Sequence, residues 1–409
     1  MRLPSYFSFH KLVNVFLRIS AIGSKFIVFT YLSKYFTDIE FGNYSLITSL
    51  VTIMIFVLGL DFYNFSIRDI LKTKETSQIQ KNIVSTVLLY LVIYTVFFVL
   101  GWAVFNQINF TKEYAFLIIA LCVTEHFSQE IYRFLVGFNK VLFANILLFL
   151  RTFIWGTYVL FLSYMSKSIS IEFILKIWTV SNALTILITL VSSLKYIDSK
   201  SISINYNWIS KGLKVSSLFF ISTIFLKLIE YANRFVVDIF LGKEMVGVYT
   251  FYSSIAILIT VYINTIVISF ELPNILKASN EAQDQQLFPK FKKSLLVQNI
   301  VISIILLLII YPILWWQNKP IFQEFQPILY FMIIGVVLMN YSLYYHFKLY
   351  VKHFDMQLVK TIVVSGIISL VLAIIATKYF GIYGAALAFS LSGGVLFYCR
   401  YYEVKKLKL

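Results

Sequence analysis

The sequence predicts an all-α integral membrane protein with about 12 transmembrane helices, arranged N-in and C-in as two pseudo-symmetric six-helix lobes around a central cavity. Of the 409 residues, 59% are hydrophobic and only 13% are charged, whereas about 25% of the residues of a soluble globular protein are charged. The apolar residues form long continuous runs, unlike the alternating pattern of membrane-spanning strands. Lys and Arg are distributed unequally among the polar segments between these runs. These observations exclude a soluble enzyme.

The individual spans follow from the length of the apolar runs. A helix needs about 20 apolar residues to cross a hydrocarbon core about 30 Å thick. The segments that meet this requirement are 12–35, 42–65, 82–105, 114–137, 141–165, 171–194, 212–237, 246–271, 294–316, 326–349, 357–378 and 382–402.

The basic residues predict the orientation. With both termini in the cytoplasm, 22 of the 35 Lys and Arg residues fall in cytoplasmic segments and 7 fall in outer loops. Cytoplasmic loops of membrane proteins collect Lys and Arg, so this bias supports the N-in and C-in arrangement. The same rule accounts for the net charge of +16, and no nucleic-acid partner is predicted. The outer loops are too short for an extracytoplasmic catalytic domain.

An internal repeat divides the chain into two halves. Residues 42–72 align without a gap on 247–277, an offset of 205, with Gly42 and Gly247 among the identities. The repeat predicts an N-terminal lobe at 1–205 and a C-terminal lobe at 206–409. Two six-span halves run in the same sense, so we expect an axis along the membrane normal and a substrate pathway between the lobes.

Cationic residues inside the predicted spans indicate an anionic substrate. Ionisable side chains are costly in the membrane and by default mark a functional interior. Arg151 lies about ten residues inside its span and has no acidic residue at helical spacing. The predicted substrate-binding residues are Arg18, Lys25, Arg151, Lys227 and Arg234.

Acidic residues and a histidine in the same spans are candidates for ion coupling. They are His126, Glu130, Glu230 and Asp238. His126 and Glu130 lie one turn apart and can titrate together; the alternative is a buried, hydrogen-bonded histidine. For Glu230 and Asp238 the alternative is structural, because Lys227 and Arg234 stand at the spacing of ion pairs within one helix. Glu130 and Arg133 have the same alternative.

The sequence predicts no metal site and no cofactor. The 2 Cys and 4 His residues are scattered, without the spacing of metal ligands. No glycine-rich loop followed by Lys-Ser or Lys-Thr occurs, so the chain lacks an ATP-binding motif. Any energy for transport is therefore expected to come from an ion gradient.

Four short motifs, in order along the chain, resemble those of polysaccharide flippases. Residues 41–44 (Phe-Gly-Asn-Tyr) resemble the FG-Y signature that follows the first helix, and 246–249 (Val-Gly-Val-Tyr) resemble the VG-Y after the seventh. Residues 129–145 resemble the region that joins the fourth and fifth helices, and 381–386 (Gly-Ile-Tyr-Gly-Ala-Ala) the opening of the last. The chain is therefore similar to the O-antigen (Wzx-type) flippases of the multidrug/oligosaccharidyl-lipid/polysaccharide (MOP) exporter superfamily.

This resemblance implies a transporter and not an enzyme. The implied substrate is an oligosaccharide repeat unit on undecaprenyl pyrophosphate, moved by alternating access from the cytoplasmic to the periplasmic leaflet of the bacterial inner membrane. Implied partners are this lipid-linked oligosaccharide, membrane lipid, and the polymerase and chain-length regulator of the same pathway. The polymer to which the units belong, O-antigen or another surface glycan, is left open.

Two other functions remain as alternatives. An O-antigen polymerase is also polytopic, but it would carry a large periplasmic loop, which the predicted spans leave no room for. A drug or cation antiporter of the same superfamily would favour an acidic binding site, whereas the acidic residues here have basic neighbours. The related lipid II flippases are disfavoured, because they usually have two spans more than the 12 predicted here.

Overall fold

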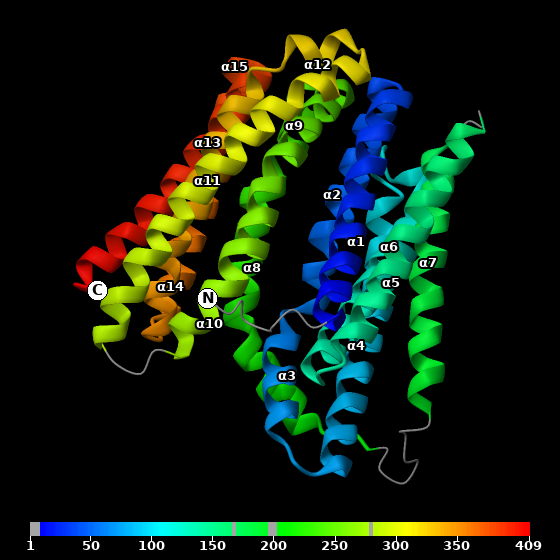
Figure 1. Ribbon diagram of the computed structural model, residues 1–409. Coiled ribbons are helices and arrows are strands. Elements are labelled where there is room, and N and C mark those ends of the chain that lie inside the picture. The colour runs from blue at the N-terminus through cyan, green and yellow to red at the C-terminus, as the bar shows by residue number, and fades with distance from the viewer. Residues whose placement is uncertain (1–8, 166–168, 195–202, 278–280) are drawn as a thin grey trace. The chain divides into compact units, whose positions relative to one another are not determined.

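The computed structural model describes residues 9–165, 169–194, 203–277 and 281–409, which form helices joined by short connections (Figure 1). The α-helices are α1 (Phe9–Tyr35), α2 (Asp38–Gly59), α3 (Phe62–Lys72), α4 (Thr76–Phe105), α5 (Ala115–Gly137), α6 (Val141–Tyr164), α7 (Ile171–Ser193), α8 (Tyr206–Leu241), α9 (Lys243–Tyr262), α10 (Ser269–Lys277), α11 (Glu281–Gln317), α12 (Pro320–Glu324), α13 (Ile328–Tyr341), α14 (Leu343–Val351) and α15 (Asp355–Lys406). A π-helical turn at Ile263–Ile268 joins α9 to α10.

The helices confirm an all-α, multi-pass membrane protein. In the described residues, 10 helical stretches are long and apolar enough to cross a membrane. Helix α5, with 23 residues, is not among them, and it carries Glu125, Glu130 and Arg133. The 52 residues of α15 count as one stretch although they form two helices. The total of 12 spans, the N-in and C-in orientation and the central cavity remain predictions.

The two halves of α15 meet at a glycine turn. Gly381 has φ 60° and ψ −143°, a conformation that is essentially restricted to glycine. The chain folds back there, so that a Cβ at Gly384 would overlap the carbonyl of Ala376. Both glycines of the motif at 381–386 are therefore required by the backbone of this turn.

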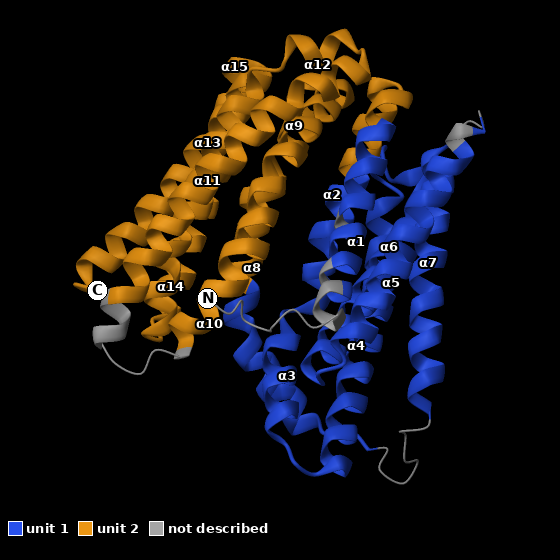
Figure 2. Cartoon of the chain, viewed as in Figure 1, with its two compact units in different colours: residues 1–32, 47–220 blue, residues 33–46, 221–409 orange. Residues whose placement is uncertain are grey.

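The chain forms two compact units, coloured separately in Figure 2. Unit 1 contains residues 1–32 and 47–220, and unit 2 contains residues 33–46 and 221–409. The units therefore divide within α8, at 220/221, and the segment that joins α1 to α2 belongs to unit 2. The lobes predicted from the repeat, 1–205 and 206–409, differ from the units in these two respects and remain a prediction.

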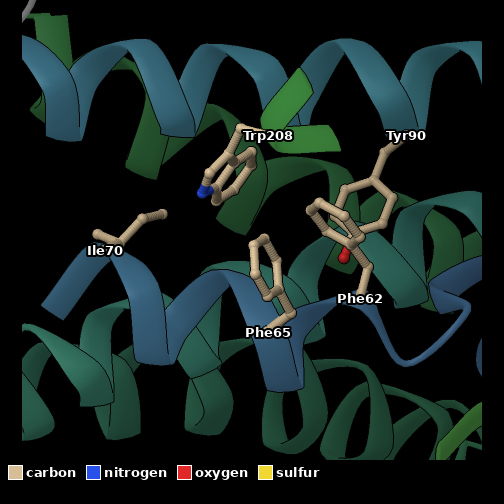
Figure 3. Close-up of a cluster of buried hydrophobic side chains, with 5 residues drawn as sticks. All are labelled: Phe62, Phe65, Ile70, Tyr90 and Trp208. Carbon is tan, nitrogen blue, oxygen red and sulfur yellow. The ribbon is translucent and has the colours of Figure 1, made fainter. Parts of the chain in front are cut away.

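An aromatic cluster holds the first turns of α8 in unit 1. The rings of Phe62 and Phe65 on α3 lie 5.5 Å and 5.2 Å from the ring of Trp208 (Figure 3). The indole Nε1 of Trp208 donates a hydrogen bond of 2.7 Å to Asp69 Oδ2. Gly212 allows close packing, because a Cβ there would lie 2.5 Å from the Phe62 ring. Burial of these large rings is the main stabilisation of this contact.

Within unit 2, the segment 33–46 packs against the start of α9. A Cβ at Gly42 would overlap the carbonyl of Lys243, and one at Gly247 would lie 3.2 Å from the carbonyl of Asp38. Lys319, which follows α11, also holds the segment: its Nζ donates 2.7 Å hydrogen bonds to the carbonyl oxygen of Phe36 and to Asp38 Oδ1. The glycines of the two motifs at 41–44 and 246–249 thus permit a main-chain contact.

Candidate functional site

A buried carboxylate on α5 organises the polar interior of unit 1. Helices α5, α6 and α7 pack against one another (Figure 1), and Glu125 on α5 is 2% exposed. Its Oε2 accepts hydrogen bonds of 3.0 Å from Trp178 Nε1 and 2.9 Å from Asn182 Nδ2, both on α7. Since Trp178 and Asn182 are four residues apart, one face of α7 supplies both donors.

The other oxygen of this carboxylate faces two cations. Glu125 Oε1 lies 3.8 Å from Lys25 Nζ on α1 and 3.7 Å from Arg151 Nη1 on α6. Trp178 also contacts Lys25, whose Nζ lies 5.2 Å from the centroid of the indole ring. One negative charge therefore serves two positive charges, and the group carries an excess charge of about +1 in a low-dielectric environment.

Arg151 is the buried member of this group and borders a pocket. Its residue exposure is 6%, and its Nε and Nη1 atoms have no hydrogen-bond partner in the described part of the chain. A small, partly open pocket of about 10 Å³ adjoins it, with room for about one water molecule, lined also by Ser128, Tyr132 and Thr185. The buried Ser128 hydroxyl likewise has no partner among the described residues. Unused donors beside a pocket are suited to an anionic oxygen ligand.

A second polar network lies one turn further along α5. His126 is fully buried, and its Nδ1 lies 2.6 Å from the Tyr94 hydroxyl. Glu130 Oε2 accepts a 2.9 Å hydrogen bond from Tyr90, and its Oε1 pairs with Arg133. His126 Nε2 lies 3.9 Å from Glu130 Oε1. The spacing thus brings together His126, Glu130 and Arg133, as predicted.

The predicted residues on α8 lie in unit 2. Lys227 Nζ donates a 2.6 Å hydrogen bond to Glu230 Oε2, so this pair matches the structural alternative. Asp238 does not pair with Arg234: its carboxylate accepts hydrogen bonds from Lys243 at the start of α9. Arg234 is buried and donates a 3.2 Å hydrogen bond to Ser253 Oγ.

Of the predicted cations, the structure brings Lys25 and Arg151 together at Glu125. Arg18 lies on an exposed face of α1. The shared carboxylate and its two α7 donors are not among the residues predicted for the site, since no spacing in the sequence connects α5 with α1, α6 and α7. A signal was nevertheless present: Trp178, Ser181, Asn182 and Thr185 form a polar stripe on α7.

Metal ligands do not gather in this region. Within the described ranges, no three His, Cys, Asp or Glu residues lie close enough to hold a metal ion.

The sequence matches one protein-family model. Residues 12–279 match the model of the polysaccharide biosynthesis protein family, and the chain belongs to this family. No curated protein matches the sequence significantly.

Solved structures of the MOP superfamily share the fold. One is an inward-facing MATE-family multidrug resistance transporter, with a TM-score of 0.80, 12% identity and coverage of 97% of this chain and 98% of that chain. Another is the lipid II flippase MurJ in an inward closed conformation, with a TM-score of 0.77, 16% identity and coverage of 97% and 87%. A third is the MATE multidrug transporter DinF-BH, with a TM-score of 0.70, 15% identity and coverage of 99% and 97%. At these identities the likeness shows the fold alone.

Proposed function

We propose that this protein is a flippase for undecaprenyl-pyrophosphate-linked oligosaccharide repeat units. It moves them from the cytoplasmic to the periplasmic leaflet of the bacterial inner membrane by alternating access, without making or breaking a covalent bond. Membership of the polysaccharide biosynthesis family supports the pathway, and the fold shared with a lipid II flippase supports a lipid-linked substrate.

The observation that carries the proposal is the excess positive charge at Glu125. A pyrophosphate that enters a low-dielectric interior needs compensating charge, because an unpaired buried anion is strongly destabilised. Arg151 has unused donors beside a pocket, and a guanidinium can bind two phosphate oxygens at once. Lys25, whose side chain is 39% exposed, is placed to pair with a second negative charge of the pyrophosphate. Neither cation is specific for one sugar, so the site suits a lipid carrier whose attached glycan varies in composition.

The remaining predicted residues keep secondary roles in this proposal. Arg18, Lys227 and Arg234 are further candidates for contact with the phosphates along the pathway. His126, Glu130, Glu230 and Asp238 are candidates for coupling to an ion gradient. Of these, His126 and Glu130 are the strongest pair, because both are buried and lie within 3.9 Å of each other. The polymerase and chain-length regulator remain the proposed protein partners.

The alternatives fit the site less well. A drug or cation antiporter requires an acidic group that is available to a cation, whereas Glu125 is already shared by two cations and two hydrogen-bond donors. A polymerase would act on units that have already crossed the membrane, so it differs from a flippase in the intermediate that accumulates when the gene is deleted.

The test compares a deletion strain with strains that carry the intact gene, Arg151→Ala, Arg151→Lys or Lys176→Ala. Lys176 is the control, because its ion pair with Glu172 is exposed and such pairs contribute little. We expect deletion to remove the surface glycan and to leave single lipid-linked units in the cytoplasmic leaflet. Arg151→Ala should behave like the deletion, and Lys176→Ala like the intact gene.

Two results would contradict the proposal. Single units attached to the final acceptor in the deletion strain would show that translocation continues, and the protein would then be a polymerase. Full-length glycan in an Arg151→Ala strain with normal protein levels would remove the role assigned to Arg151.

A further inference from the structure

A second pocket lies in unit 2, between the two halves of α15. It has a volume of about 210 Å³ and is partly open. Lys360 and Val364 line it from the first half, and Tyr398, Tyr402 and Glu403 from the second. Because the chain reverses at Gly381, the pocket adjoins the beginning and the end of α15, near the C-terminus marked in Figure 1. None of the residues proposed for flipping lies in it.

Glu403 is an unusual wall for a membrane pocket, since it is 8% exposed and unpaired. Its carboxylate has no ion pair or hydrogen bond in the described part of the chain. Arg400, three residues earlier on the same helix, donates a 2.7 Å hydrogen bond to Ser342 Oγ instead. The carboxylate oxygens are not among the enclosed unpaired atoms, so they are accessible, and a ligand that supplies a cation can pair with them directly.

Lys360 provides the opposite charge at the exposed mouth of the same pocket. Its side chain is exposed and forms no ion pair with Glu403. The pocket therefore presents one unpaired anion and one unpaired cation, too far apart to neutralise each other directly. A ligand with both a cation and an anion satisfies the two together.

Thr361 and Cys399 also line the pocket, and the rest of its wall is mostly apolar and suits a lipid chain. Val364 and the rings of Tyr398 and Tyr402 line the pocket, and these tyrosines are 61% and 51% exposed. Exposed tyrosines are enriched where a helix meets the headgroups of the bilayer. Lys405 and Lys406 follow directly and are exposed, so the predicted N-in and C-in orientation would put this end of α15 at the cytoplasmic leaflet.

We propose that this pocket binds a phospholipid with a primary-ammonium headgroup, of the ethanolamine type. The ammonium donates hydrogen bonds to the Glu403 carboxylate, the phosphate accepts from Lys360, and an acyl chain lies along Val364 and the tyrosines. A purely anionic headgroup would leave Glu403 unpaired. A choline headgroup would supply the charge but no N–H donor. The site is independent of the flippase proposal.

The test is native mass spectrometry of the purified full chain in detergent, titrated with phosphatidylethanolamine, phosphatidylcholine and phosphatidylglycerol of identical acyl chains. We expect phosphatidylethanolamine to bind about tenfold more tightly than either of the others, the size of one charge-assisted hydrogen bond. Glu403→Gln should abolish this preference. Lys360→Gln should weaken the binding of all three lipids alike, because each carries the phosphate.

Lys378→Gln is the matched control, since Lys378 lies near the opposite end of the same helical half and outside the pocket; we expect its lipid binding to equal that of the unmodified chain. Equal affinity for the three lipids, a preference for phosphatidylcholine, or a preference for phosphatidylethanolamine that survives Glu403→Gln would each overturn the proposal. The selectivity of the unmodified chain decides the matter even if a variant fails to fold.

Discussion

Gly42 and Gly247 each pack against the main chain of the other's helix. Gly42 meets the carbonyl of Lys243, and Gly247 meets that of Asp38. The offset of 205 that relates the two glycines also relates Asp38 to Lys243, so the contact obeys the symmetry of the sequence repeat. The two motifs that the sequence repeat aligns are thus the two sides of one contact within unit 2.

Two glycine substitutions, one in this contact and one outside it, should have opposite effects on the stability of the protein. Gly42→Ala forces a methyl group onto the Lys243 carbonyl, and we expect it to destabilise the protein by about 1–3 kcal/mol, as overpacking does. Gly23→Ala, on α1 with nothing within 4 Å of the added Cβ, should stabilise by about 0.5–1 kcal/mol. Thermal unfolding of the two variants in detergent measures both. Equal shifts of the midpoint would contradict the close approach at Gly42.

Removal of Glu125 should cost more stability than removal of one of its cations. In Glu125→Gln, both Lys25 and Arg151 lose their counter-ion, and we expect destabilisation by about 3–5 kcal/mol. Lys25→Gln leaves Glu125 paired with Arg151 and should be much milder. The amount of folded protein recovered on size exclusion after a temperature series gives the ranking. The reverse order would show that Glu125 is not the shared counter-ion.

The hydrogen bond between Trp208 and Asp69 should contribute measurably to unit 1. Trp208→Phe keeps an aromatic ring in the cluster of Figure 3 but removes the Nε1 donor. We expect a loss of about 1.5–3 kcal/mol, typical of hydrogen bonds to charged groups. Trp315→Phe is the control, because Trp315 is 81% exposed. If the unfolding midpoint of Trp208→Phe matches that of the control, the hydrogen bond is unimportant.

A side chain at Gly381 should strain the turn within α15. Gly381→Ala places a Cβ at φ 60°, and we expect it to destabilise by about 1–2 kcal/mol from backbone strain alone, since no atom lies within 4 Å of that Cβ. Gly394→Ala, on the second half of α15, meets only Leu338 at 3.8 Å and should be neutral or better. An unfolding midpoint unchanged by Gly381→Ala would argue against the left-handed turn.

Hydropathy predicted the fold class because lipid imposes a length and an apolar composition on every span. The same constraint explains the exception: polar groups on α5 face the interior of unit 1 rather than lipid. The turn that interrupts α15 at Gly381 falls between the predicted spans 357–378 and 382–402.

The candidate site was predicted in part. Arg151 stood out because a lone arginine inside an apolar run requires a partner, yet its partner Glu125 comes from another helix. The pairing of Asp238 with Lys243, and not with Arg234, depends on the bend between α8 and α9 at Gly242. Side-chain spacing within one helix carries no information about such contacts.

The most direct test of the account is the leaflet position of the substrate itself. The purified protein is reconstituted into vesicles that carry an undecaprenyl-pyrophosphate-linked repeat unit, and a glycosidase added outside reports the accessible fraction over time. We expect the intact protein to bring the protected half of the units to the enzyme, Arg151→Ala to slow this about tenfold or more, and Arg151→Lys to retain part of the rate. Accessibility equal to that of protein-free vesicles, with correctly folded protein, would contradict the flippase.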